Sequence, residues 1–270
     1  MEFLVELLQY PFMQRAVICG VAISICAALI GVILVLKRYS MIGHSLGEVG
    51  FAAISLALVF NLPDIYVTIP IVILAAFIIL IVSQKKGERG EVAIALVSAG
   101  ALAFGVILTS ITNGFNIDVY NYMFGSILTM SIQDVITSVV LSIILIIMYT
   151  IFYNRLFSVT YDEKYAKACG INITFYQFLI ALFTAIVVVI GMKLMGTLLI
   201  SSLIVFPAII SKKLTKSFKG MAVMSVCISV ICFISGLFIS ALLDLPTGAS
   251  IVIIYIVVLL ISSIWKRIVK

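Results

Sequence analysis

The strongest constraint on the fold of this chain is a series of apolar runs, each about as long as a lipid bilayer is thick. A helix needs about 20 apolar residues to cross the hydrocarbon core. Its backbone polar groups must be hydrogen-bonded within the segment, which an α-helix achieves. The nine runs are residues 15–36, 42–60, 64–83, 91–112, 132–153, 173–191, 194–211, 221–243 and 247–265. The sequence therefore predicts an all-α, polytopic membrane bundle of about nine transmembrane helices.

The composition agrees with a chain that lies mostly in lipid. Hydrophobic residues make up 64% of the chain and charged residues 10%, whereas soluble proteins average about 45–50% and about 25%. No polar stretch is long enough for a soluble domain, so we expect residues 1–270 to form a single transmembrane domain. The net charge of +6 does not indicate nucleic-acid binding, because the basic residues are spread over short segments between apolar runs.

The distribution of basic residues predicts the orientation of the bundle. If the end of the first run is cytoplasmic, all lysines and arginines except Arg15 and Lys193 fall on the cytoplasmic side. The basic residues predicted on the cytoplasmic side are Lys37, Arg38, Lys85, Lys86, Arg89, Arg155, Lys164, Lys167, Lys212, Lys213, Lys216, Lys219, Lys266, Arg267 and Lys270. Such an excess of positive charge is typical of cytoplasmic loops. We therefore expect the N-terminus outside and the C-terminus inside.

The second run begins with the only histidine of the chain, followed four residues later by a glutamate. Residues at positions i and i+4 share a helix face, so His44 and Glu48 are expected to point the same way. Ionisable groups within a span are costly and by default indicate function. Imidazole and carboxylate groups are both ligands of divalent transition metals. The alternative is a structural pair at the membrane edge, in which Glu48 pairs with His44 or with a nearby lysine.

The longest predicted cytoplasmic loop, residues 154–172, contains the pattern of a short helix. Asp162 and Glu163 suit its first turn, Lys167 suits its last turn, and Gly170 is a typical C-terminal stop. The segment is either a docking element for a cytoplasmic partner or an ordinary solvated helix.

Two other places depart from a regular transmembrane pattern. Pro207 lies inside the seventh run, where a proline removes a backbone hydrogen bond and kinks the helix unless neighbours compensate. Residues 113–131 are too polar for a span but apolar in patches. We expect an external loop there, followed by a short re-entrant helix.

Five segments follow one another in an order and spacing that are informative together. They are residues 36–43, 122–128, 162–171, 195–208 and 245–252. From about residue 12 to the C-terminus, the chain resembles the permease subunit of metal-type ABC importers, the family that moves zinc, manganese or ferrous iron. Residues 122–128, with Phe124 and Gly125, are similar to the family's phenylalanine-glycine loop. Residues 162–171 are similar to its cytoplasmic coupling segment.

The resemblance implies a permease that forms the translocation path as a homodimer in the bacterial plasma membrane. Two cytoplasmic ABC ATPase subunits would supply the energy, and an extracytoplasmic metal-binding protein would deliver the ion. The chain contains no phosphate-binding motif of the G-x-x-x-x-G-K-[ST] type, so it is not expected to be an enzyme. No permanently bound cofactor is expected, because the divalent metal ion is the cargo.

The resemblance also implies roles for individual residues. In the family, the second span carries an aspartate and, four residues later, a histidine as metal ligands, and the matching positions here are His44 and Glu48. Two ligands from each of two subunits would match the four of a tetrahedral zinc site. The changed residue types leave the choice between zinc, manganese and iron open. Pro207 is assigned to a kink along the pathway. The residues assigned to ATPase coupling are Tyr161, Asp162, Glu163, Tyr165, Ala166 and Gly170.

Two other functions remain to be weighed. A permease for iron-siderophore or corrinoid complexes would need a wide apolar path without a ligand pair in the second span. An ion-coupled secondary transporter would be expected to have inverted repeats and charges at the membrane midplane, neither of which is evident. Import rather than export follows from the resemblance alone.

Overall fold

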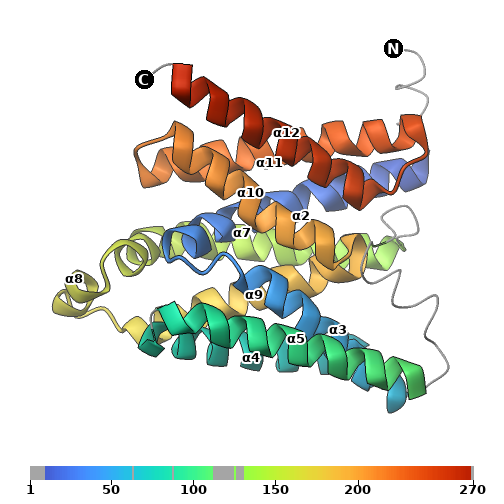
Figure 1. The fold of residues 1–270 in the computed structure, drawn as a ribbon, viewed down its shortest axis with the longest axis horizontal. Helices are drawn as coiled ribbons and strands as arrows, with labels where there is room; N and C mark the ends of the chain where they lie inside the picture. Colours follow the sequence, from blue (N-terminus) through green and yellow to red (C-terminus); the bar gives the residue numbers. More distant parts are fainter. Residues whose placement is uncertain (1–9, 63, 87, 112–124, 126–130, 269–270) are drawn as a thin grey trace.

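The computed structural model describes residues 10–62, 64–86, 88–111, 125 and 131–268. Within these residues the chain forms α-helices joined by short connections and contains no strand. The helices are α2 (Pro11–Leu36), α3 (Ile42–Val59), α4 (Asp64–Lys86), α5 (Glu88–Ile111), α7 (Ile132–Tyr161), α8 (Glu163–Ala168), α9 (Ile173–Met195), α10 (Thr197–Leu214), α11 (Phe218–Leu243) and α12 (Thr247–Ile268). Figure 1 shows all of them except α8 running roughly side by side as one bundle.

The predicted all-α membrane bundle is confirmed. Over the described ranges, eight helices are long and apolar enough to cross a membrane. At the position of the remaining predicted span, α4 has a shorter apolar stretch, Tyr66–Val82. The prediction for residues 113–131 lies outside the described residues, apart from Gly125 and Ser131.

The boundary between the fifth span and the loop after it was predicted wrongly. The span was expected to end at residue 153, but α7 continues to Tyr161. Leu156 and Val159 are fully buried, so the helix keeps an inward-facing apolar side beyond the polar residues that suggested its end. Arg155 donates a hydrogen bond to the Tyr176 hydroxyl at 3.0 Å, which gives this charged residue a partner on α9. The non-helical part of the predicted loop is therefore much shorter than 154–172.

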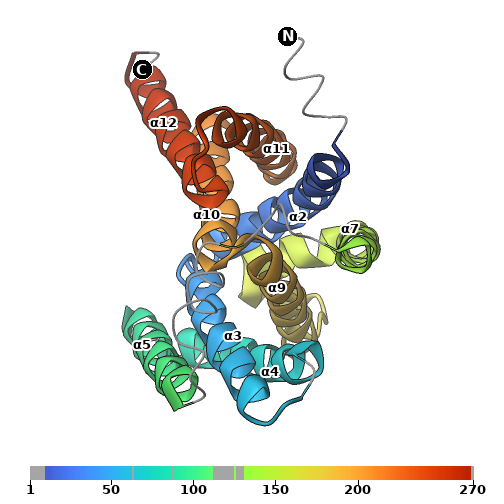
Figure 2. The same cartoon turned by 90° about the vertical axis from the view of Figure 1, so that its right-hand side faces the viewer.

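The helices pack into two groups that share a central pair. In one group, α3 packs against α4 and α5. In the other, α10 packs against α2, α11 and α12, and α2 also contacts α7. Helices α9 and α10 both contact α3 and α2, and so connect the groups, as the nearly end-on view in Figure 2 shows.

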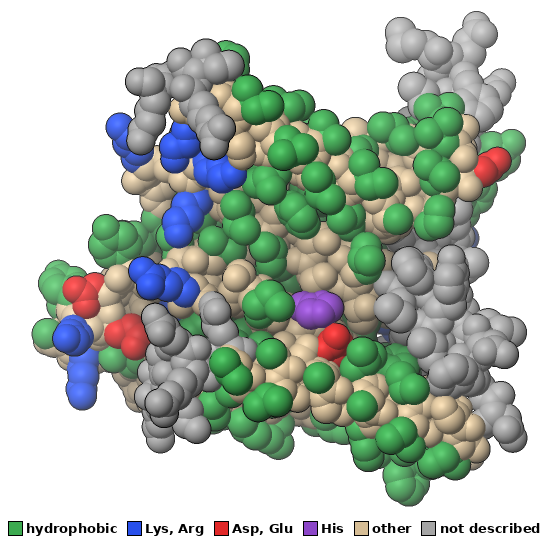
Figure 3. All heavy atoms as spheres, in the orientation of Figure 1, with side chains coloured by type: hydrophobic (Ala, Val, Ile, Leu, Met, Phe, Trp, Pro, Cys, Tyr) green, Lys and Arg blue, Asp and Glu red, His purple; other side chains and the backbone are tan. Residues whose placement is uncertain are grey.

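One end of the bundle carries most of the visible positive charge. In Figure 1, α8 protrudes at this end, on the left. On the face drawn in Figure 3, the lysine and arginine side chains gather at the same end, while the surface between the two ends is mainly hydrophobic. An apolar band between polar ends fits a protein that crosses a membrane.

Candidate functional site

Helix α3 has one face formed by glycines that lies against its neighbours. A Cβ atom at Gly47 would lie 3.4 Å from the Thr197 side chain on α10. A Cβ atom at Gly50 would lie 2.6 Å from Met192 Cε on α9. Small residues allow this close approach between helices in a membrane. Because this face is packed on α9 and α10, the side chains of His44 and Glu48 project from a different side of α3.

His44 and Glu48 face each other as the sequence predicts. His44 Nε2 lies 3.3 Å from Glu48 Oε1. The histidine side chain is 48% exposed and the glutamate side chain is 15% exposed. In Figure 3 the single histidine, in purple, lies at the surface of the drawn face among hydrophobic side chains. The pair thus combines an accessible imidazole with a recessed carboxylate.

The recessed carboxylate has a second partner, which the sequence analysis missed. Ser98 on α5 donates a hydrogen bond from Oγ to Glu48 Oε2. The only sequence signal was a small polar residue within the apolar fourth run, and serine is too common in spans to single out.

The pair supplies two metal donors of suitable chemistry, a ring nitrogen and a carboxylate oxygen. In the described part of the chain, no group of three or more His, Cys, Asp and Glu side chains is arranged to hold a metal ion. One copy of the chain therefore offers two such donors here, on a face that a second molecule can reach.

An apolar groove of about 380 Å³ lies between α3 and α5, toward the C-terminal end of α3 from the pair. Its lining includes Val49 and Ala52 from α3 and Leu96, Gly100 and Phe104 from α5. Val49 follows Glu48 in the chain, so the wall of this groove begins at the residue next to the carboxylate.

The short helix predicted in the cytoplasmic loop exists as α8. The Asp162 carboxylate caps its N-terminus by accepting hydrogen bonds from the backbone N–H groups of Lys164 at 2.9 Å and Tyr165 at 3.0 Å. Gly170 ends it with a positive φ of 75°, and its N–H bonds the Lys167 carbonyl. The stop at Gly170 is the role that the sequence predicted. Asp162 was expected within the first turn, but it lies one residue before the helix and caps it.

The six residues assigned to coupling do not form one surface. Ala166 is fully buried, whereas Tyr161 and Tyr165 are exposed. Tyr161 is the last residue of α7, not part of α8. Tyr165 lies within α8 and Tyr161 lies two residues before it, so the two exposed tyrosines offer aromatic surface at this end of the bundle.

Glu163 points back to the bundle. Its Oε1 atom lies 2.7 Å from Lys37 Nζ, in the corner between α2 and α3. The Lys37 side chain is only 5% exposed, whereas that of Glu163 is 41% exposed. The glutamate therefore compensates a nearly buried positive charge.

Pro207 is buried in α10, and the helix is continuous around it from Thr197 to Leu214. Ile204, one turn earlier, lies against Gly43 in the first turn of α3. Pro207 is thus on a helix that touches the one carrying His44, but it does not meet the histidine-glutamate pair in the contacts described above.

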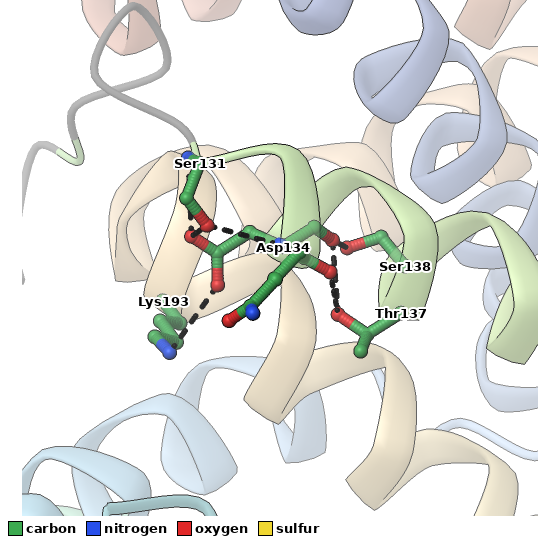
Figure 4. A network of polar contacts seen from close by, with 6 residues as sticks. Ser131, Asp134, Thr137, Ser138 and Lys193 are labelled. Atoms are coloured by element: carbon green, nitrogen blue, oxygen red, sulfur yellow. Dashed lines mark hydrogen bonds and ion pairs between the residues drawn. The ribbon is translucent and has the colours of Figure 1, made fainter.

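At the other end of the bundle, the structure gives Lys193 a partner. Figure 4 shows its ammonium group near Asp134, with Lys193 Nζ 3.4 Å from Asp134 Oδ1. Asp134 also forms a capping box with Ser131 at the N-terminus of α7. The ion pair of Lys193 with Asp134 therefore joins the end of α9 to the start of α7.

Gly125, from the phenylalanine-glycine segment, lies against the connection between α9 and α10. It has a positive φ of 71°, and a Cβ atom there would lie 2.2 Å from the backbone carbonyl carbon of Met195. Glycine is the residue that suits both the conformation and the contact.

Comparison with known families identifies the architecture. A family model described as the ABC 3 transport family matches residues 9–266. The solved structure described as PsaBC from Streptococcus pneumoniae in complex with Fab superposes with a TM-score of 0.86 and 27% identity, covering 97% of this chain and 94% of that chain.

Three curated relatives cover nearly the whole chain. A probable metal transport system membrane protein of Thermotoga maritima is 31% identical, over 94% of this chain and 90% of its own. The manganese import system permease protein ScaB of Streptococcus gordonii is 26% identical, over 97% and 94%. The high-affinity zinc uptake system membrane protein ZnuB of Buchnera aphidicola is 27% identical, over 93% and 97%. The relatives thus include proteins named for manganese and for zinc.

Proposed function

The chain belongs to the ABC 3 transport family, and from this premise we propose that it is the permease subunit of an ATP-driven importer for a divalent transition-metal ion. It is a multi-pass membrane protein, which we place in the plasma membrane of a bacterium. The relatives named for manganese and zinc transport support a bare metal ion as the cargo.

The observation that carries the proposal is the pair formed by His44 and Glu48. Their facing atoms are 3.3 Å apart on an accessible face of α3, and both are ligand types for zinc, manganese or iron. We propose that the transported ion binds transiently between them. A transport site needs such modest coordination, because it must release the ion as well as bind it.

We further propose that two copies of the chain enclose the path. The exposed histidine lies among hydrophobic side chains on the face drawn in Figure 3, so a second copy packed on this face would exclude water and lipid. A two-fold axis near the pair would bring two histidines and two glutamates together. These four ligands are the number found in tetrahedral zinc sites.

The energy is proposed to come from a pair of cytoplasmic ATPase subunits that dock at the α8 end. The exposed Tyr161 and Tyr165 and the nearby basic residues support this end as the cytoplasmic one. With that orientation, the N-terminus is outside, the C-terminus is inside, and an extracytoplasmic metal-binding protein delivers the ion to the opposite end.

The test is uptake by the permease reconstituted with its ATPase partner in proteoliposomes. Zinc, manganese, ferrous iron and an iron-siderophore complex are supplied separately, with and without ATP. We expect ATP-dependent uptake of at least one bare ion and none of the chelate. The variants His44→Ala and Glu48→Ala should each lower that uptake by about tenfold or more at unchanged complex assembly. Full uptake by both variants would rule out this site, and uptake of the chelate alone would rule out the proposed cargo.

A further inference from the structure

The two oxygens of the Glu48 carboxylate have different partners. Oε1 lies 3.3 Å from His44 Nε2, toward the accessible face. Oε2 accepts the hydrogen bond from Ser98 Oγ, toward α5. Ser98 is 8% exposed, so its hydroxyl is shielded from competing water. The carboxylate is therefore held at its inner oxygen by Ser98, while its outer oxygen faces His44, the other proposed ligand.

The bond from Ser98 differs from those of two other buried hydroxyls on the same two helices. Ser55 on α3 donates to the carbonyl of Phe51 in its own helix, at 2.9 Å. Thr109 on α5 likewise donates to Gly105, at 3.0 Å. Ser98 instead donates its hydrogen bond to an ionisable side chain on another helix. A carbonyl of its own helix could have accepted this bond, so the need for a hydrogen-bond partner does not by itself explain where the hydroxyl points.

A second bond between the same helices fixes their register. Ser45 Oγ on α3 donates to the Ile94 carbonyl on α5 at 3.4 Å, one turn before the bond between Glu48 and Ser98. Ser45 and Ile94 are both buried. The two bonds together keep Ser98 opposite Glu48, so the position of the hydroxyl is set by the packing of α3 on α5.

We propose that Ser98 is a positioning residue that limits Glu48 to binding the transported ion through one oxygen, and that it thereby favours zinc over manganese. This inference rests on the proposed function of the pair. Zinc is commonly four-coordinate, with nitrogen and single oxygen donors. Manganese suits a larger set of oxygen donors, and a carboxylate that offers both oxygens provides it. Because the serine hydroxyl donates to Glu48 Oε2, that oxygen is not free to bind the ion.

The test compares substitutions of equal shape that differ in the hydroxyl. Ser98→Thr keeps the hydroxyl, and Ser98→Val replaces it by a methyl group. Ser55→Ala is the matched control, because it removes a buried hydroxyl from α3 that does not touch Glu48. Each permease is reconstituted with its ATPase, and zinc and manganese uptake are measured in competition. If Ser98→Val fails to assemble, Ser98→Ala takes its place.

We expect Ser98→Val to lower the zinc-to-manganese uptake ratio by about tenfold, the scale on which the loss of a hydrogen-bond partner of a metal ligand changes metal binding. Ser98→Thr and Ser55→Ala should keep the wild-type ratio. A ratio that is the same for Ser98→Val and Ser98→Thr overturns the assignment, as does an equal shift in Ser55→Ala. A wild-type complex that takes up neither zinc nor manganese overturns the role of Ser98. If it takes up no ferrous iron either, the proposed function fails as well.

Discussion

Lys37 Nζ lies 2.7 Å from Glu163 Oε1, although the two residues are 126 positions apart in the chain. The ion pair joins the corner between α2 and α3 to the first turn of α8. The same corner leads into α3, whose third residue is His44. A displacement of α8 would therefore act directly on the start of the helix that carries the proposed metal ligands.

We predict that reversing one charge of this pair weakens the complex and that reversing both restores it. Glu163→Arg places a second positive charge beside the nearly buried Lys37, so thermal stability in detergent and association with the ATPase should both fall. The loss is expected to be about 1–3 kcal/mol, below that of a fully buried pair because Glu163 is partly exposed. Adding Lys37→Glu to Glu163→Arg should recover stability.

The double variant also separates two roles of Glu163. If a pull-down recovers ATPase binding together with stability, the glutamate acts through Lys37. If stability returns but binding does not, Glu163 contacts the ATPase directly. Unchanged stability in Glu163→Arg alone would contradict the importance of the ion pair.

Tyr161 and Tyr165 are predicted to contribute to ATPase binding without contributing much to the stability of the permease. Both rings are exposed, so replacing them by alanine removes little buried surface within this chain, whereas aromatic side chains often dominate the energy of an interface. We expect each alanine variant to weaken ATPase association by about tenfold in a pull-down titration. Tyr66→Ala, which removes an exposed tyrosine from α4, is the control and should bind normally. Normal binding by both α8-end variants would exclude a docking role for these rings.

Gly125→Ala is predicted to destabilise the permease. The residue has a positive φ, which costs a residue with a Cβ atom about 1–2 kcal/mol, and the added carbon would lie 2.2 Å from the Met195 backbone. The connection between α9 and α10 must then move. We expect a lower melting temperature in detergent and reduced uptake. Gly100→Ala is the matched control, because a Cβ atom there meets no atom within 4 Å; equal melting temperatures for the two variants would contradict the argument.

Tyr39 is predicted to make the folded permease sensitive to alkaline pH. Burial, and next the negative charge of Glu163, raise the pKa of Tyr39 from 10.0 to about 12. The folded state thus holds this proton more tightly than the unfolded state. Its contribution to stability is complete below pH 10 and is lost as the pH rises toward 12. The melting temperature, measured at a series of pH values between 10 and 12, should fall less steeply with pH for Tyr39→Phe than for the wild type. An equal dependence on pH in the two proteins would show that Tyr39 does not cause the effect.

Local patterns in the sequence were enough to predict most of the helices. The apolar runs place every predicted span on an observed helix because bilayer thickness sets the length of a run. A stop such as Gly170 acts within a few residues, so the short helix α8 and its end could also be predicted. The end of α7 could not be predicted, since it depends on the burial of Leu156 and Val159 in the folded bundle.

The sequence by itself determined that this is a helical membrane protein. It also determined that His44 and Glu48 share a helix face, because a spacing of four residues fixes their relative direction. Only the tertiary structure decided which of the two is accessible and which is recessed. It also brought Ser98 to the second carboxylate oxygen and Glu163 to Lys37. These contacts join helices that are far apart in the chain, and they follow from how closely the helices pack, which no local pattern of residues specifies.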